Sequence, residues 1–266
     1  MNIEVASENA FIIYFGESTT PAISTQVQQA SKLLYAKLGD LVIDQVTSYA
    51  SLLLIFDALR VDQYTVKSLI IEALEQSESA DANSAKVSDN NQSSDHKITP
   101  SIATKIIELP VYYSQESGPE LSLISEQSGL SIEEVIEVHQ SLSYRVYAIG
   151  FAPGFAFLGQ VDERIATPRL STPRLSVPRG AVGIADRQTA IYPDVSPGGW
   201  NLIGLCPTRM FNPNSTPHMP VSVGDEVRFK RISKAEFEAL GGVIEECASS
   251  HHGKDPQAND QIAGKA

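Results

Sequence analysis

Cysteine is scarce in this chain of 266 residues, which contains only Cys206 and Cys247 and no CxxC pair. That scarcity argues against a disulfide framework and against a zinc site built from clustered cysteines. It fits a reducing, cytoplasmic environment. Long apolar runs are missing too, because the segment from Leu52 to Phe56 is far too short to cross a bilayer. The first residues have no cationic start, so we expect no signal peptide.

Positive charge is also in short supply, with 20 Lys and Arg against 32 Asp and Glu and a net charge of −12 at pH 7. Sequence-independent nucleic-acid binding needs a cationic surface that displaces counterions, so we expect no such partner. The exception is a basic cluster from Arg164 to Arg187, which indicates a small-anion site or a partner surface. The sequence contains no HExxH motif, no phosphate loop and no Ser-His-Asp order. By motif alone it is neither a self-sufficient ATPase nor a metalloenzyme, and we expect no metal.

The first half of the chain is typical of a small α/β domain, which we place at residues 1–115. The expected elements are a strand at 11–15, a helix from 20 to 38, strands at 41–49 and 51–56, a helix after Asp62, and a strand at 105–113. This order is that of a split βαβ, ferredoxin-like unit. From 77 to 99 the sequence is almost entirely polar, which indicates a disordered insert before the last strand.

The second half, at 116–248, is expected to form a compact β-barrel or sandwich, so that the whole chain is α+β. It begins with a helix at 121–128, and Ser131 with Glu134 forms a capping box for a second helix that ends near 142. Short strands between Gly and Pro turns follow at 144–149, 181–185, 190–192, 201–205 and 226–231. The polar tail at 249–266 is expected to be mobile.

The segment GFAPGF, at 150–155, directly follows an expected strand. A tight turn at Pro153 and Gly154 would present backbone N–H groups together with the rings of Phe151 and Phe155. This loop is interpreted as the floor of a pocket for a small flat ligand, or as a rigid loop that packs its own aromatic rings into the core.

Three Pro-Arg pairs follow, and they place Arg169, Arg174 and Arg179 at five-residue spacing. A guanidinium binds carboxylate or phosphate through two parallel hydrogen bonds, and a preceding proline stiffens the chain that aims it. In an extended chain the odd spacing would turn Arg174 away from the other two, so at most two should share a site. The alternative is that each arginine is a solvated surface residue.

The segment from 185 to 204 combines polar and aromatic residues. Gln188 and Thr189 offer a donor and acceptor pair for an amide, and Tyr192 and Trp200 offer flat apolar walls. A turn at 196–199, which contains Ser196, Gly198 and Gly199, could hold an oxyanion on its N–H groups.

Two residues are candidates for a catalytic acid or base. Asp194 could act as a general base, although exposed aspartates in turns are common and most have no chemical role. His139 lies on the apolar face of its helix, where a histidine is more often a satisfied core residue than a catalyst.

Three long motifs of this chain resemble the family of B subunits of bacterial ATP-dependent 5-oxoprolinases: HQSLSYRVYAIGFAPGFAFLG, the PR-x3-PR-x3-P run and QTAIYPDVSPGGWNLIG. The family is also called allophanate hydrolase subunit 1-like, and it includes an inhibitor of a sporulation histidine kinase. The resemblance implies a cyclophilin-like barrel, ATP as co-substrate, and a complex with the A and C subunits, of which the C subunit is a paralogous barrel protein. The implied reaction opens 5-oxo-L-proline to L-glutamate with ATP and water. The chain departs from the pattern at Ala181, Asp186 and Leu205-Cys206.

Under this resemblance we expect Arg169 or Arg174 to bind the substrate carboxylate. Gln188 and Thr189 would address the lactam amide, the turn at 196–199 would hold an anionic oxygen, and aromatic residues would enclose the ring. Those aromatic residues are Phe151, Phe155, Tyr192 and Trp200. The alternative function is a regulatory protein that binds and inhibits a sensor histidine kinase. A third possibility, prolyl isomerase activity, rests on fold analogy alone.

Overall fold

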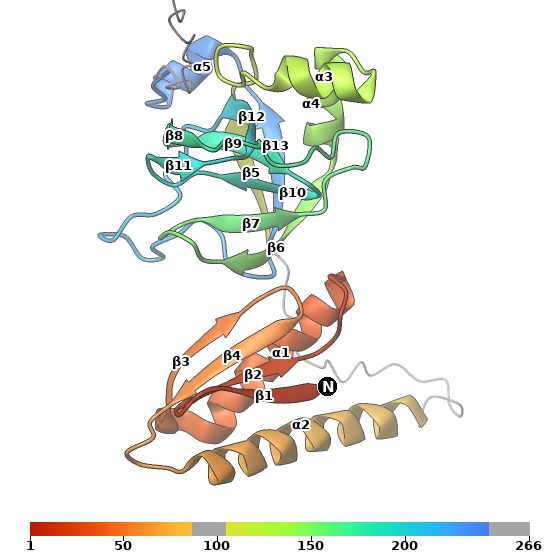
Figure 1. Ribbon diagram of the computed structural model, residues 1–266, viewed down its shortest axis with the longest axis vertical. Coiled ribbons are helices and arrows are strands. Elements are labelled where there is room, and N and C mark those ends of the chain that lie inside the picture. Colours follow the sequence, from red (N-terminus) through yellow and green to blue (C-terminus); the bar gives the residue numbers. More distant parts are fainter. Residues whose placement is uncertain (87–104, 245–266) are drawn as a thin grey trace, which may run out of the picture.

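The structure is a computed structural model that describes residues 1–86 and 105–244, without the side chains of 77–86. Within this part of the chain the fold consists of two units, shown one above the other in Figure 1. The amino-terminal unit is a sheet covered by helices, and the second unit is a β-barrel. No helix among the described residues is long and apolar enough to span a membrane.

The amino-terminal unit is a four-stranded antiparallel sheet with two helices. Its elements are β1 (Asn2–Ser7), β2 (Ala10–Tyr14), α1 (Pro21–Leu38), the short 3-10 helix η1 (Gly39–Leu41), β3 (Val42–Thr47), β4 (Ser51–Phe56) and α2 (Gln63–Lys86). The strand order is β1-β2-β4-β3. Both helices begin where the sequence predicts, because the side chains of Thr20 and Asp62 accept hydrogen bonds from the N–H groups of Ile23 and Thr65.

The ferredoxin-like prediction is wrong about which strand completes this sheet. The edge position beside β2 is taken by β1, whose Ile3 pairs with Ile13, and not by the strand expected at 105–113. That later strand, β5 (Ile106–Val111), pairs in parallel with the last strand of the barrel. Its side chains Leu109 and Val111 are buried in the barrel core, so it belongs to the second unit.

Helix α2 also extends further than the sequence predicts. It continues to Lys86, so the expectation of disorder is wrong for 77–86. Once a helix has a packed first half, each further residue adds a backbone hydrogen bond at little cost. The remainder of the expected insert, 87–99, and the expected tail at 249–266 lie outside the described residues.

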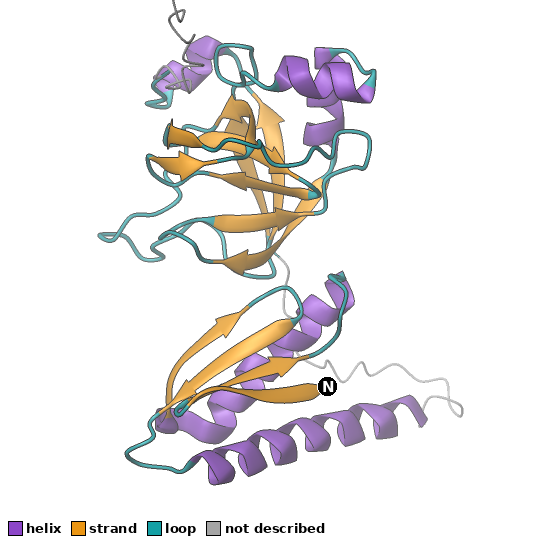
Figure 2. Ribbon diagram, in the orientation of Figure 1, coloured by secondary structure: helices purple, strands orange, loops and turns teal. Residues whose placement is uncertain are grey.

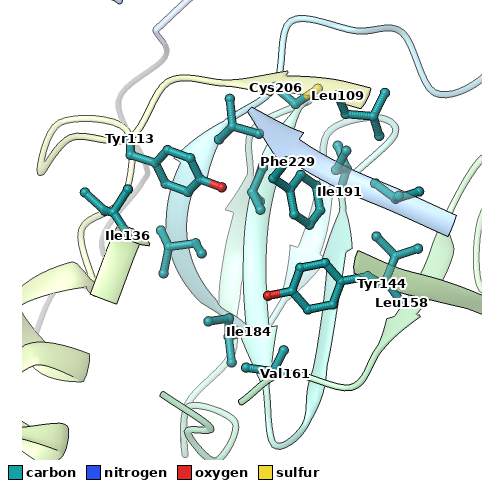
Figure 3. Close-up of a cluster of buried hydrophobic side chains, with 14 of the residues drawn as sticks. Leu109, Tyr113, Ile136, Tyr144, Leu158, Val161, Ile184, Ile191, Cys206 and Phe229 are labelled. Atoms are coloured by element: carbon teal, nitrogen blue, oxygen red, sulfur yellow. The ribbon is translucent and has the colours of Figure 1, made fainter. Parts of the chain in front are cut away.

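The barrel is a seven-stranded sheet in the order β12-β9-β10-β7-β6-β13-β5. Its strands are β5, β6 (Ser143–Ile149), β7 (Ala156–Gly159), β9 (Ala181–Ala185), β10 (Gln188–Ile191), β12 (Asn201–Leu205) and β13 (Glu226–Arg231). Two hydrogen bonds between Tyr112 and Leu205, of 2.8 and 2.9 Å, join its two edges and nearly close it. The interior is filled by residues such as Leu158, Ile184 and Phe229, which Figure 3 shows together.

Additional elements surround the barrel. A two-stranded ribbon pairs β8 (Arg174–Val177) with β11 (Ser196–Gly198). Helices α3 (Leu121–Ser128), α4 (Ile132–Ser141) and α5 (Lys234–Ala239) gather at the end of the barrel away from the amino-terminal unit, as Figure 2 shows. The predicted capping box at Ser131 and Glu134 is confirmed.

Polar contacts fix the amino-terminal unit against the barrel. Arg145 of β6 donates from Nε to Ser24 and from a terminal nitrogen to Thr25, each at 3.1 Å, both on helix α1. Gln160 donates to the carbonyl of Thr19 at 3.2 Å. These bonds link helix α1 and the loop before it to strand β6 and the loop after β7.

Candidate functional site

The loop that follows β6 has the special backbone that its Gly and Pro content predicts. Gly154 has φ of 90°, and a Cβ there would lie 2.7 Å from the Cβ of Phe211. Phe151 also has positive φ, at 72°, and its side chain is 71% exposed. Phe155 is buried, so the loop holds one ring in the fold and presents another to solvent, while Pro153 is exposed.

Phe155 is the centre of an aromatic cluster on one flank of the barrel. Its ring lies edge-on to Tyr192 at 5.4 Å and to Trp200 at 5.7 Å, measured between ring centroids. Phe157 lies 4.8 Å away and also contacts Trp200. The rings of Phe151, Phe155, Tyr192 and Trp200 therefore lie in one cluster, in which Tyr192 and Trp200 are largely buried.

The cluster continues into the amino-terminal unit through Tyr49, which lies in the turn between β3 and β4. The ring of Tyr49 stacks on Tyr147 at 5.4 Å and meets the edge of Phe157 at 6.4 Å. Its hydroxyl accepts a hydrogen bond of 2.5 Å from Nε2 of Gln188. We call this cluster of rings, from Trp200 through Phe157 and Tyr147 to Tyr49, the aromatic wall; Trp200 and Tyr147 are buried, and Phe157 and Tyr49 are half-buried.

Arg169 lies at this wall. Its guanidinium carbon is 5.8 Å from the centroid of the Trp200 ring, a cation–π contact, and the residue is exposed. Its charge opposes the rise that burial produces in the pKa of Tyr49 and in that of Tyr192. The guanidinium therefore lies at the Trp200 end of the wall and is open to an incoming anion.

Arg174, in contrast, is largely buried and bonded to other residues of the protein. It forms an ion pair with Glu120 in which both side chains are only 11% exposed, and it donates to the carbonyl of Trp200 at 3.3 Å. Glu120 also accepts the N–H of Leu202 at 2.8 Å. Burial raises the pKa of Glu120, against the opposing effects of Leu202 and Arg174. As the spacing predicts, Arg174 does not share the exposed position of Arg169, and Arg179 is exposed elsewhere on the chain.

His139 and Thr189 lie in the barrel core and not at the wall. Both are fully buried, and Nε2 of His139 lies 3.0 Å from Oγ1 of Thr189. Burial lowers the pKa of His139 to about 3. The ring stacks on Phe229 at 4.7 Å. The interpretation of His139 as a satisfied core residue is confirmed, and the expectation that Thr189 addresses a ligand amide is wrong because no ligand can reach it.

The segment expected to form an oxyanion-binding turn is a strand. Ser196 pairs with Val177 and Gly198 with Arg174, so its backbone groups belong to the β8–β11 ribbon. A Cβ on Gly198 would lie 2.3 Å from the hydroxyl of Tyr192, which explains the glycine by packing. Gly199 accepts the N–H of Leu170 at 2.7 Å through its carbonyl.

Asp194 is exposed, and its side chain accepts the N–H of Val195 at 2.8 Å. This contact is the local one expected of an aspartate in a turn. The Asp194 carboxylate forms no hydrogen bond or ion pair with the residues of the aromatic wall.

The described residues offer little that suits a metal ion or the phosphates of ATP. They contain no group of three or more His, Cys, Asp or Glu placed to hold a metal ion. A phosphate group binds well at a helix N-terminus, but α3, α4 and α5 each carry glutamate there, at Glu120, Glu134 and Glu236. At α4 and α5 the glutamate is bonded to the capping serine and would repel phosphate. At α3, Glu120 is already paired with Arg174, and the first turn of α1 holds no acidic residue.

Residues 1–221 match the family described as "Carboxyltransferase domain, subdomain C and D". The chain is 36% identical over 237 residues to the 5-oxoprolinase B subunit of Bacillus subtilis (strain 168), covering 89% of this chain and 95% of that protein. It is 44% identical over 126 residues to the 5-oxoprolinase B subunit of Escherichia coli O157:H7, covering 47% of this chain and 58% of that one.

Solved structures show the same fold. The crystal structure of the protein TTHA0988 matches with a TM-score of 0.68 at 30% identity, over 85% of this chain and 40% of that chain. This chain therefore spans less than half the length of TTHA0988. Urea carboxylase of Kluyveromyces lactis has a TM-score of 0.67 at 17% identity, over 89% of this chain and 22% of that chain, which is a likeness of fold alone.

Proposed function

Because the chain belongs to the family of 5-oxoprolinase B subunits, within the carboxyltransferase domain subdomain C and D family, we propose that it is the B subunit of an ATP-dependent 5-oxoprolinase. The complex opens 5-oxo-L-proline to L-glutamate and needs the A and C subunits. The observation that carries the proposal is 36% identity along 95% of the Bacillus subtilis B subunit.

The aromatic wall supports this assignment by its chemistry. The substrate is a small ring with a carboxylate and an amide, and it requires a cation, a flat apolar surface and a neutral polar pair. Arg169 supplies the cation, the exposed ring of Phe151 and the half-buried ring of Phe157 supply the surface, and Gln188 supplies an amide. We assign the carboxylate to Arg169 and not to Arg174, because Glu120 already neutralises Arg174.

Opening an unstrained lactam requires activation of its carbonyl, and transfer of a phosphoryl group to the amide oxygen supplies that activation. We place ATP on a partner protein of the complex, since the sequence of this chain contains no phosphate loop. The residues of this chain would then bind and orient the lactam at the wall. We further propose that the barrel is cyclophilin-like and that the complex works in the cytoplasm.

A reconstitution experiment tests the function. The chain is mixed with candidate A and C subunits, 5-oxoproline and ATP, and glutamate is measured while each chain is omitted in turn. We expect glutamate only from the complete mixture. If the A and C proteins produce glutamate with another B subunit but not with this one, the proposal is overturned in favour of a regulator that binds a sensor kinase.

A further inference from the structure

Tyr49 is the one side chain of the amino-terminal turn at 48–50 for which ring contacts with the barrel are found in the described structure. It lies parallel to Tyr147, with an angle of 18° between the rings, and edge-on to Phe157 at 62°. Gln188 of β10 donates to its hydroxyl. A residue of the first unit therefore completes a surface that the second unit begins.

The hydrogen-bonding capacity of this pair is not used up. A phenol hydroxyl both accepts and donates, and Tyr49 accepts from Gln188 without donating to any other residue of the described chain. The Oε1 atom of Gln188 likewise accepts no bond from the residues that the structure describes, and it is not a buried atom lacking a partner. Both residues are partly exposed, so one donor and one acceptor are available side by side.

The hydroxyl of Tyr49 keeps its proton at neutral pH. Burial raises its pKa above the ordinary value and Tyr147 raises it further, while Arg169 and the hydrogen bond from Gln188 lower it by less. Tyr49 is therefore a hydrogen-bond donor under working conditions and not a phenolate.

A five-membered lactam matches this arrangement. Its ring holds the amide in the cis form, so that the N–H and the C=O lie along the same edge. We propose that Tyr49 and Gln188 bind this edge of 5-oxo-L-proline. The Tyr49 hydroxyl donates to the lactam oxygen, and the lactam N–H donates to Oε1 of Gln188. With the existing bond from Gln188 to Tyr49, this closes a ring of three hydrogen bonds, and each donor has an acceptor.

The inference rests on the proposed function, and it makes Tyr49 a specificity-determining residue. Proline has the same ring and carboxylate but no carbonyl oxygen on the ring, so it would leave the Tyr49 donor unpaired. A site built to hydrogen-bond a group rejects the analogue that lacks it more strongly than an apolar pocket does. Arg169, at the same wall, provides for the carboxylate that both molecules share.

The test uses the assembled complex and the substitution Tyr49→Phe, which keeps the ring and removes the hydroxyl. We expect the KM for 5-oxoproline to rise about tenfold, the effect of losing one hydrogen bond. The thermal unfolding midpoint should stay close to that of the wild type. The matched control is Tyr35→Phe, on the same unit, where Tyr35 is 63% exposed on α1 away from the wall.

A second variant tests the acceptor. Gln188→Met removes Oε1, and N-methyl-5-oxoproline is the probe that removes the lactam N–H. The wild-type complex should prefer 5-oxoproline over the N-methyl probe, and this preference should shrink severalfold in Gln188→Met but persist in Tyr49→Phe. A purely structural role for Gln188 would leave the ratio between the two substrates unchanged in Gln188→Met.

The outcomes separate this inference from the function on which it rests. A wild-type mixture that forms no glutamate overturns both. A wild-type mixture that depends on this chain, with unchanged KM in Tyr49→Phe or an unchanged preference in Gln188→Met, overturns the inference alone.

Discussion

The Nε2 atom of His139 lies 3.0 Å from Oγ1 of Thr189, and this contact fixes the direction of a buried chain of hydrogen bonds. Thr189 donates its only proton to the carbonyl of Gly183 at 3.0 Å, so it must accept from His139. Nδ1 of His139 then accepts from the hydroxyl of Tyr113 at 2.8 Å. The imidazole is neutral, with its proton on Nε2, and the whole chain is satisfied.

The first prediction concerns pH. Burial lowers the pKa of His139 to about 3, below the value of 6.5 for a free histidine. The unfolded chain therefore binds a proton at His139 that the folded chain does not, once the pH falls below about 6.5. The contribution of His139 to the free energy of unfolding is fully present above that pH. It should fall by about 1.4 kcal/mol per pH unit as the pH decreases towards 3. Urea unfolding between pH 7 and 5 measures the slope.

Variants of the two described histidines separate this effect from that of other groups. His139→Gln should show a smaller loss of unfolding free energy between pH 7 and 5 than the wild type, because glutamine does not titrate. His218→Asn, at an exposed position, should retain the wild-type slope. Equal slopes in His139→Gln and the wild type would contradict the prediction.

The second prediction concerns the ion pair of Arg174 and Glu120. Replacing Arg174 by Leu leaves the Glu120 carboxylate buried without its cation, which should lower the free energy of unfolding by about 3–5 kcal/mol. Denaturant unfolding checks it. The double variant with Glu120→Leu removes both charges and should recover a large part of the loss. A double variant less stable than Arg174→Leu would show that the bond from Leu202 to Glu120 matters more than the charge.

The third prediction concerns Arg169 in the assembled complex. Arg169→Lys keeps the positive charge but loses the planar fork that binds a carboxylate through two bonds. We expect the KM for 5-oxoproline to rise about tenfold or more, with little change in unfolding. Arg179→Lys is the control, because Arg179 also follows a proline and is exposed. Wild-type kinetics in Arg169→Lys would show that Arg169 does not bind the substrate carboxylate.

The fourth prediction compares two glycines of one loop. Gly154→Ala would adopt positive φ and bring its Cβ within 2.7 Å of Phe211, so we expect a loss of about 2 kcal/mol or more in unfolding free energy. Gly150→Ala has open space around its Cβ and should change stability by less than about 0.5 kcal/mol. A loss at Gly154→Ala as small as that expected at Gly150→Ala would mean that the loop adjusts without strain.

Features specified by neighbouring residues could be predicted from the sequence. The helix starts at Thr20, Asp62 and Ser131 are set by side chains three residues or fewer from the N–H groups they cap. The assignment of β5 to a sheet could not be predicted in this way. Its apolar residues fit either unit, and only pairing with a strand far along the chain decides between them. The alternation of Ile3 and Val5 with polar residues was a signal for β1, although most of this strand is exposed.

The candidate site also contains residues that the sequence indicates and residues that only the structure reveals. The aromatic rings and Arg169 lie in one segment with unusual composition, so the sequence indicates them. Glu120, which neutralises Arg174, and Tyr49, which completes the wall, come from distant and ordinary segments. A tyrosine in a turn between two strands has no local feature that marks it, and its role follows only from how the two units meet.

The pairing of β5 with β13 has a consequence for synthesis on the ribosome. Strand β5 pairs with β13, in which Glu226 is the partner of Ile106. Most of the barrel therefore has to be translated before its sheet can be completed. The first unit needs no residue beyond its own sheet and helices, and it can fold early. Nascent chains stalled before 226 should therefore hold a folded first unit followed by a barrel with an unpaired edge, the stage at which a chaperone would be most needed.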